Sequence, residues 1–318
     1  VKSIIKKHKP EVIGLQETKV HDDEYPFEAI KEMGYESFVN GQKGHYGVAL
    51  LSKRKPIKSG KGFKNDKSDD QKRFIWGEFK SGKKSFYVLN GYFPQGEERN
   101  HPTKFPAKRK FYKDLTNHLK ENHTPKDLLV LMGDLNISPE DIDIGIGEQN
   151  RRRWLRTGKC SFLPEEREWL SKLTSWGLED TFRSMYPEVN DQYSWFDYRS
   201  RGFEDKPKRG LRIDQIWATQ SLNKSIREVG IDYIIDTEGP QIRTACSSSD
   251  SIYLENGERV QIRSYDNLNA SSPNFERFTS IKDSTLFKTS FSLNPGYALI
   301  DLVPGNIIYI NTEGPVVL

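Results

Sequence analysis

The stretch LLVLMGDLNISPED (128–141) carries a carboxylate to the end of an apolar run. Five apolar residues in succession predict a short buried strand, and Gly133, Asp134 and Asn136 follow it closely. Two other stretches share this arrangement: VIGLQE ends on Glu17, and LRID places Asp214 within another apolar run. Because the ends of covered strands meet at the rim of a sheet, we expect these three acids to converge there.

Three carboxylates at one rim would repel one another unless a cation lay among them. Oxygen ligands without a histidine or cysteine partner suit Mg²⁺, with Mn²⁺ as a substitute. Such an ion acts as a Lewis acid on a phosphoryl oxygen, and a nearby carboxylate can take the proton from an attacking water. A single acid after a strand is more often a turn former or a helix cap, but the repetition favours a site.

Helical and strand patterns alternate around this stretch. Because the predicted strands are strongly apolar, we expect an α/β or α+β domain whose sheets are covered on both faces. The composition of the sequence changes near Gly239. After it, Trp and His are absent, and short runs of alternating apolar and polar residues become more frequent. We therefore predict one domain over 1–238 and a β-rich segment over 239–318. The expected strands are 46–52, 74–79, 85–93 and 211–219, and the expected helices are 1–8, 104–119 and 165–176.

Charge and composition narrow the class of protein. Residues 1–238 hold 43 basic and 37 acidic side chains, a net charge of +6, which permits an anionic partner such as nucleic acid. No apolar run approaches the roughly 20 residues that span a bilayer, and no signal peptide is visible, so we expect no membrane contact. With only Cys160 and Cys246 there is no disulfide framework, which favours the cytoplasm.

Several motifs together resemble the bacterial exodeoxyribonuclease III family, the Xth-type AP endonucleases: VIGLQETK, GQKGHYGVALLSK, NGYFPQGE, MGDLNISPEDIDIG and GLRIDQIWAT. The likeness extends over about residues 1–235. It implies a four-layer α/β sandwich, with two packed β-sheets flanked by helices. It also implies Mg²⁺-dependent phosphodiester hydrolysis in duplex DNA, with 3′→5′ exonuclease, abasic-site endonuclease and 3′-phosphatase activities.

The resemblance also implies roles for five residues. Glu17 corresponds to the principal Mg²⁺ ligand, and Asp134 corresponds to the base that activates water beside the metal. Asn136 corresponds to the amide that supports the transition state near the metal, and Tyr92 to the phenol at the scissile phosphate. Asp214 corresponds to the acid that positions the family's histidine. Without the resemblance, Tyr92 would be read as an ordinary core tyrosine.

Two basic stretches with aromatic residues predict a DNA-binding surface: RRRWLRTGK (151–159) and WFDYRSRGFEDKPKRG (195–210). Their cations would contact phosphates, while an aromatic ring would fill the gap left by a missing base. The alternative is a solvated basic loop with its aromatic side chain turned inward. The candidates are Arg151, Trp154, Trp195 and Arg199, with Gln95, Lys104 and Lys108 as weaker phosphate contacts.

This chain departs from the family's pattern at both ends of the resemblance. It begins after the family's first strand and Asn-x-Asn turn, so we expect a nuclease domain truncated at its N-terminus. The family's closing Ser-Asp-His is also missing, no histidine follows His123, and the nearest equivalent is Ser249-Asp250-Ser251. Loss of that histidine predicts activity lowered by about a hundredfold or more.

The leading interpretation is a Mg²⁺-dependent repair nuclease acting on double-stranded DNA with abasic sites or 3′ ends. We expect a monomer in the bacterial cytoplasm, associated with the nucleoid through DNA. One alternative is a catalytically dead remnant that binds damaged DNA and carries a β-rich interaction module. Another is a phosphatase of the endonuclease/exonuclease/phosphatase superfamily, to which the resembled family belongs, acting on lipid head groups. The extended basic stretches argue against it, because a small head group needs no such surface.

Overall fold

The protein is described by a computed structural model that covers residues 1–67, 70–197 and 202–231 and five short strands after them. The chain divides into two compact units, Val1–Tyr233 and Ile234–Leu318. The boundary predicted near residue 238 lies outside the described residues, as do Arg199 and Ser249–Ser251. In the second unit the described residues are strands: β12 (Arg243–Ala245), β13 (Val260–Ser264), β14 (Thr289–Asn294), β15 (Ile307–Tyr309) and β16 (Pro315–Val317).

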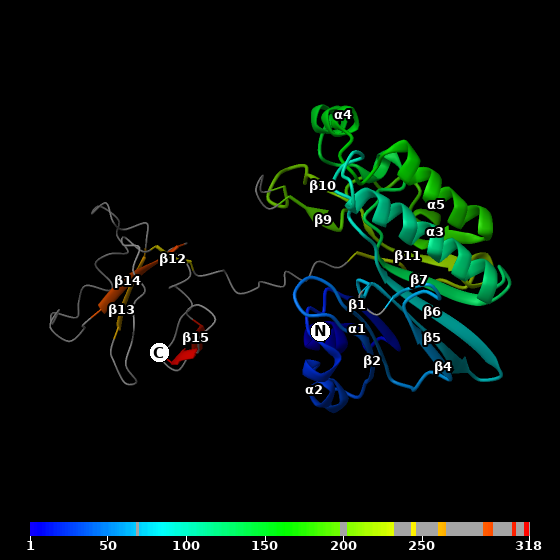
Figure 1. The fold of residues 1–318 in the computed structure, drawn as a ribbon, viewed down its shortest axis with the longest axis horizontal. Coiled ribbons are helices and arrows are strands. Elements are labelled where there is room, and N and C mark those ends of the chain that lie inside the picture. Colours follow the sequence, from blue (N-terminus) through cyan, green and yellow to red (C-terminus); the bar gives the residue numbers. More distant parts are fainter. Residues whose placement is uncertain are drawn as a thin grey trace. The chain divides into compact units, whose positions relative to one another are not determined.

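A six-stranded mixed sheet forms the centre of the first unit (Figure 1). Its strands β6 (Lys84–Tyr92) and β7 (Leu128–Asp134) run parallel, and helix α3 (Lys104–Asn122) connects them, whereas the other neighbours are antiparallel. In order across the sheet, the strands are β4 (Lys58–Lys61), β5 (Phe74–Ser81), β6 (Lys84–Tyr92), β7 (Leu128–Asp134), β11 (Asp214–Thr219) and β8 (Leu178–Asp180).

A three-stranded antiparallel sheet packs against the six-stranded one, in the order β1 (Val12–Gln16), β3 (Val48–Ser52), β2 (Glu36–Asn40). Every residue of β3 is buried because both faces of this sheet are covered. Val48 and Leu50 join a core cluster with residues of β5 and β6, whereas Ala49 and Leu51 join a cluster with residues of α2. This alternation places successive side chains of β3 in two different layers.

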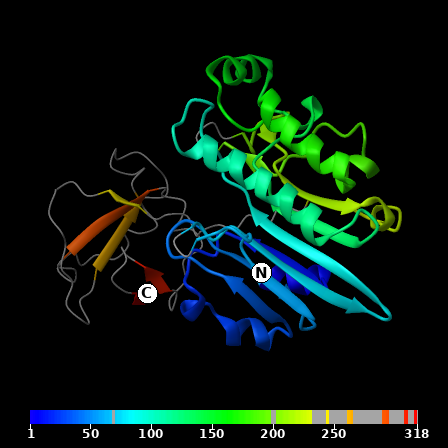
Figure 2. The same cartoon turned by 45° about the vertical axis from the view of Figure 1, so that its right-hand side comes forward.

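Helices cover the outer faces of both sheets (Figures 1 and 2). Helices α1 (Lys2–His8) and α2 (Phe27–Glu32) lie on the side of the three-stranded sheet. Helices α3 (Lys104–Asn122) and α5 (Pro164–Trp176) lie on the six-stranded sheet, and their apolar side chains share its core cluster. The buried residues of α3 recur every three or four positions, which is the pattern of a helix with one covered face. The predicted four-layer α/β sandwich is therefore confirmed.

The remaining elements are short, apart from the basic helix α4 (Glu148–Thr157). Among the described residues, no helix is both long enough and apolar enough to cross a membrane. The short elements are η1 (Asp22–Glu24), η2 (Asp141–Asp143), α6 (Thr181–Met185), β9 (Trp195–Phe196), β10 (Gly210–Leu211) and α7 (Gln220–Asn223).

The single strand predicted over 211–219 is wrong in one respect. Strand β10 pairs with β9, the chain then leaves the ladder at Arg212, and β11 begins only at Asp214. The Arg212 side chain is buried and forms ion pairs with Asp143 and Asp180, which hold this turn in place. Asp214 therefore begins a strand instead of following one.

Candidate functional site

Three predicted site residues form a row across three neighbouring strands. Tyr92 of β6 is the register partner of Asp134 of β7, and Asp134 is the register partner of Asp214 of β11. Because β11 is antiparallel to β7, the beginning of β11 lies beside the end of β7. Residues paired in this way project from the same face of a sheet, so the structure brings these three side chains together.

A glycine explains how closely these strands approach. Gly133 has φ +141°, and a Cβ atom on it would lie 1.9 Å from the carbonyl oxygen of Gly91. Any larger residue would separate β7 from β6 at the position just before Tyr92 and Asp134. The glycine in MGDLN therefore permits the spacing of the row.

Glu17 reaches the row from the other sheet, directly after β1. It has φ +55°, a left-handed conformation that is uncommon for a residue with a side chain and is often retained at functional positions. Its Oε1 accepts a 2.6 Å hydrogen bond from the Tyr92 hydroxyl, and its Oε2 lies 2.9 Å from the Lys19 ammonium. Burial raises the pKa of Glu17, but the bonds from Tyr92 and Lys19 outweigh it and leave the pKa below its ordinary value. Glu17 is therefore an anion at neutral pH.

Asn90 joins the two sheets beneath the site. Its fully buried side-chain amide donates to the carbonyl oxygens of Leu15 and Ala49, at 2.9 and 3.0 Å, and its oxygen accepts from Gln16. The facing β1 residue is Gly14, where a Cβ would approach the Asn90 oxygen to 2.7 Å. A polar residue inside the apolar run YVLNGY was the sequence signal for this cross-link.

Asn136 orients Asp134. The Asn136 backbone N–H donates to Asp134 Oδ1, and its side-chain Nδ2 donates to Asp134 Oδ2, both at 2.9 Å. Nδ2 also donates to the Phe93 carbonyl oxygen at 2.9 Å. Burial raises the pKa of Asp134 well above its ordinary value, and the charges of Asp214 and Glu17 raise it further. Asp134 is thus a carboxylate with an increased affinity for protons, as a general base requires.

Lys108 supports this site from within and does not contact solvent. Its ammonium is fully buried, forms an ion pair of 2.5 Å with Glu166 and donates to the Asn136 carbonyl oxygen at 2.8 Å. The expectation that Lys108 contacts phosphate is therefore wrong. Sequence reasoning missed the Glu166 partner because 58 residues separate the two.

Asp214 lies at the solvent side of the row. Ser194 Oγ accepts hydrogen bonds from the backbone N–H groups of Ile213 and Asp214, at 2.9 and 2.8 Å, and fixes the start of β11. Burial by surrounding protein raises the pKa of Asp214 to about 6, and the charge of Glu17 adds to the rise, although bonds from Ser194 and its own backbone oppose it. The side chain itself is exposed, so water weakens this effect. Asp214, Gln16 and Gly133 line a hollow of about 240 Å³.

The oxygen atoms at this rim fit a hard divalent cation in part. Among the described residues, no three His, Cys, Asp or Glu side chains lie close enough to complete a metal site alone. Mg²⁺, however, is commonly held by one or two carboxylates, with water and substrate phosphate as its other ligands. Glu17 and Asp134 supply such carboxylates. Burial raises the pKa of Asp134 most, and a cation would relieve the further rise that the charges of Asp214 and Glu17 cause.

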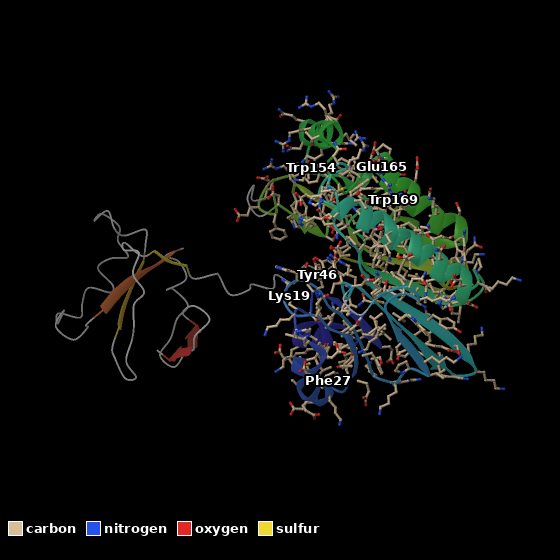
Figure 3. The ribbon with its side chains drawn as sticks, viewed as in Figure 1. Lys19, Phe27, Tyr46, Trp154, Glu165 and Trp169 are labelled. Carbon is tan, nitrogen blue, oxygen red and sulfur yellow. The ribbon has the colours of Figure 1, made fainter. Side chains whose placement is uncertain are left out.

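The structure corrects the expectation for Trp154. Its ring is only 7% exposed, stacks on Phe162 at 5.6 Å, and carries the Lys159 ammonium 3.9 Å above it. It belongs to the core cluster beneath α4, so it is not a DNA-contacting side chain. The inward-turned aromatic residue, weighed as an alternative, is what the structure contains. Figure 3 shows Trp154 at the foot of α4, whose basic side chains extend outward.

The other predicted DNA contacts among the described residues differ in how far their side chains are exposed and already paired. Arg151 pairs with Asp141 and Glu148, and Lys104 pairs with Glu97, so their charges are partly compensated. Gln95 is exposed, and its side chain accepts from the Glu97 N–H at 2.6 Å. Trp195 is half-buried and follows Ser194, the residue that fixes Asp214.

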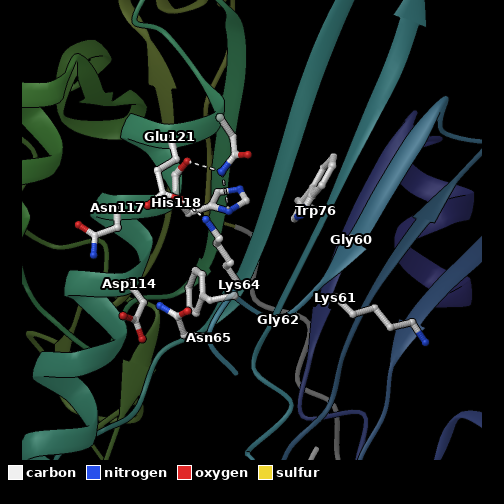
Figure 4. A pocket seen from close by; sticks show the side chains of 12 residues that line it. Gly60, Lys61, Gly62, Lys64, Asn65, Trp76, Asp114, Asn117, His118 and Glu121 are labelled. Atoms are coloured by element: carbon white, nitrogen blue, oxygen red, sulfur yellow. Dashed lines mark hydrogen bonds and ion pairs between the residues drawn. The ribbon is translucent and has the colours of Figure 1, made fainter. Parts of the chain in front are cut away.

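A separate hollow of about 620 Å³ lies between β4, β5 and α3 (Figure 4). Trp76 and His118 line it, and burial lowers the pKa of His118 to about 4, so this ring is neutral at pH 7. The hollow shares no residue with the acidic row. It therefore does not contribute to the site.

Comparison with known proteins shows the family to which the chain belongs. The family model described as the Endonuclease/Exonuclease/phosphatase family matches residues 1–250. Exodeoxyribonuclease III of Haemophilus influenzae is 54% identical over 231 residues, which are 73% of this chain and 86% of that protein. An exodeoxyribonuclease of Bacillus subtilis is 28% identical over 229 residues, or 72% of this chain and 84% of that protein.

Two solved structures are similar to this chain in fold. The 3′ phosphatase NExo from Neisseria, bound to a product DNA hairpin, has a TM-score of 0.63 and 31% identity over 71% of this chain and 83% of its own. An AP endonuclease from Archaeoglobus fulgidus has a TM-score of 0.62 and 28% identity, covering 70% of this chain and 82% of its own.

Proposed function

Since this chain belongs to the endonuclease/exonuclease/phosphatase family, as an exodeoxyribonuclease III-type nuclease, we propose that it hydrolyses phosphodiester bonds of duplex DNA at abasic sites and 3′ ends. Mg²⁺ is the proposed cofactor, with Mn²⁺ as its substitute. The observation that carries the proposal is the row of Tyr92, Asp134 and Asp214 in register, with Glu17 joined to it from the other sheet.

Each side chain has a role that follows from its bonds. Asp134, with its raised pKa, accepts the proton of the attacking water, and Asn136 holds its carboxylate in one orientation. Both Asn136 amide hydrogens are already donated, so contact with a transition state would require this amide to exchange a partner. Burial and the bond to Glu17 raise the pKa of Tyr92, so the phenol keeps its proton and serves as a hydrogen-bond donor.

Glu17 and Asp134 would hold the divalent cation together with water and a phosphate oxygen. When bound, the cation supplies Lewis-acid polarisation of the phosphate and stabilises negative charge that develops in the transition state. Asp214, held by Ser194 at the edge of the row, contributes negative charge and a further acceptor at the solvent side.

The basic helix α4 and the loop after β9 form the proposed DNA-binding surface. Arg153 and Arg156 on exposed positions of α4 complement a phosphate backbone, which extends farther than a lipid head group. Arg152 is exposed too, but Glu148 partly compensates its charge. The proposed partner is therefore double-stranded DNA, bound by a monomer in the bacterial cytoplasm.

A second candidate function is binding of damaged DNA without cleavage. The sequence feature that favours it is the absence of histidine from residues 124–318, where the family has its closing Ser-Asp-His. One assay separates the two functions: cleavage and binding of an abasic duplex by the parent protein and by Asp134→Ala, with Mg²⁺ and with a chelator. Cleavage by the parent alone, and only with the cation, supports the nuclease. Equal binding by both proteins with cleavage by neither would favour the binding protein.

A further inference from the structure

Arg73 lies between two tyrosine rings beside the acidic row. Its guanidinium carbon is 4.3 Å from the centroid of Tyr46 and 4.6 Å from the centroid of Tyr92. Arg73 immediately precedes β5, and Tyr46 lies two residues before β3, so both sheets contribute to the arrangement. Two aromatic faces restrict the guanidinium plane, which leaves the cation pre-oriented before any ligand arrives.

The hydrogen bonds of Arg73 go to neutral acceptors. Its Nη1 donates to the Tyr92 carbonyl oxygen at 3.0 Å, and its Nε donates to Gln71 Oε1 at 2.7 Å. Gln71 in turn donates to the Tyr46 hydroxyl at 2.9 Å, which ties the second ring to the same group. In the part of the chain that the structure describes, none of the ion pairs includes Arg73.

Arg73 is not required as the counter-ion of Glu17, because Lys19 already lies 2.9 Å from that carboxylate. Figure 3 shows Lys19 and Tyr46 next to each other at one edge, and the Lys19 N–H donates to the Tyr46 carbonyl oxygen at 2.8 Å. A half-buried arginine held beside Tyr92, which forms no ion pair among the described residues and whose charge lowers the pKa of Glu17, is an arrangement that favours an anionic ligand.

We propose that Arg73 binds a phosphodiester oxygen of the DNA strand that lies over Tyr92, an inference that rests on the proposed nuclease function. A planar guanidinium matches the geometry of two phosphate oxygens better than an ammonium does. Arg73 would thereby hold one phosphate in register while Asp134 acts on the scissile bond. The competing role is purely structural: Arg73 would only hold the Tyr92 ring in place.

Binding in the presence of a chelator tests the proposal, because cleavage then does not interfere. The variants are Arg73→Gln and Arg73→Lys, and the matched control is Arg54→Gln, which removes an exposed charge just beyond the opposite end of β3. We expect Arg73→Gln to bind an abasic duplex about 10- to 100-fold more weakly, because a charge-assisted hydrogen bond is lost. The slope of log K against log salt should also fall by about 1, and Arg54→Gln should preserve both values.

Neutral methylphosphonate groups, placed singly along the duplex, distinguish phosphate binding from support of Tyr92. At one position the substitution should weaken binding by the parent and leave binding by Arg73→Gln unchanged. Arg73→Lys should retain sensitivity at that position at lower affinity, and it serves in place of Arg73→Gln if the glutamine variant unfolds.

Two outcomes would overturn the inference in distinguishable ways. Additive effects of Arg73→Gln and methylphosphonate at every position, in a parent that cleaves abasic DNA, would leave Arg73 with the structural role only. A parent that neither binds nor cleaves abasic duplex would overturn the proposed function and this inference with it.

Discussion

The Tyr92 hydroxyl donates a 2.6 Å hydrogen bond to Oε1 of Glu17, and the two residues belong to different sheets of the sandwich. Tyr92 ends β6 of the six-stranded sheet, and Glu17 follows β1 of the three-stranded sheet. This bond joins the proposed cation ligand to the row that contains the proposed base. The site is therefore assembled by the packing of two sheets and does not belong to either sheet alone.

Tyr92→Phe should lower the cleavage rate by about a hundredfold, because it removes a hydroxyl that would donate to the transition state. The change should also raise the pKa of Glu17, because the bond from Tyr92 helps to hold that pKa below its ordinary value. Single-turnover cleavage of an abasic duplex with Mg²⁺ measures the rate. A parental rate in this variant would remove Tyr92 from the proposed mechanism.

Asp134→Asn should lower cleavage by about 10²- to 10⁴-fold, because an amide cannot accept the proton of the attacking water. In the parent, the rate should rise with pH as Asp134 loses its proton, since only the deprotonated carboxylate acts as a base, and a bound cation should lower its pKa from the raised value of the cation-free protein. Rates of the parent and variant from acid to neutral pH check both statements. Asp23→Asn, at an exposed acid of η1, is the matched control and should cleave like the parent.

Asp214→Asn should change how stability depends on pH. The folded-state pKa of Asp214, about 6, lies above its ordinary value of 3.8, so its contribution to stability is present below about pH 4 and is lost as pH rises through about 6. The variant lacks this loss, so it should gain stability over the parent between pH 4 and pH 7, by about 1 kcal/mol after allowance for solvent screening.

Urea unfolding of both proteins at these two pH values, without divalent cation, measures the gain from Asp214→Asn. Mg²⁺ added at pH 7 should stabilise the parent more than the variant. If the difference in unfolding free energy between the two proteins is the same at both pH values, the pKa of Asp214 is not raised in the folded protein.

Lys108→Met should destabilise the protein by about 3–5 kcal/mol, because it leaves the buried charge of Glu166 without its partner. The double variant Lys108→Met/Glu166→Gln removes both charges and should recover part of the loss. Glu166 also accepts from the Ser161 and Leu163 N–H groups, so recovery should be incomplete. Urea unfolding of the parent, Lys108→Met, Glu166→Gln and the double variant gives the coupling energy, and an unaltered midpoint in Lys108→Met would show that the pair contributes nothing.

Local pattern allowed prediction of covered sheets with helices, whereas the four layers were implied by the resemblance to the exodeoxyribonuclease III family. The helix predicted over 104–119 and the strand at LLVLM correspond to α3 and β7 within a few residues. The convergence of Glu17, Asp134 and Asp214 was also predicted, because strand ends in a covered sheet meet at a rim, whereas the role of Tyr92 was implied only by the resemblance.

What could not be predicted depends on pairs that are distant in the chain. The interruption of the strand at Arg212 follows from its bonds to Asp143, which lies 69 residues earlier. Lys108 was expected at the surface, and the inward-turned alternative for Trp154 stayed open, because composition does not show which side of a helix is covered. The stacking of Arg73 between Tyr46 and Tyr92 likewise requires three separate segments to meet.

The buried amide of Asn90 holds the two sheets at a fixed separation, and the distance between Glu17 and Asp134 depends on that separation. Because this cross-link and the Tyr92–Glu17 bond both span the same interface, a void opened between the layers would shift the cation ligand away from the base without altering either. A core variant could then lose turnover because the distance between Glu17 and Asp134 has changed, even though both residues are still present.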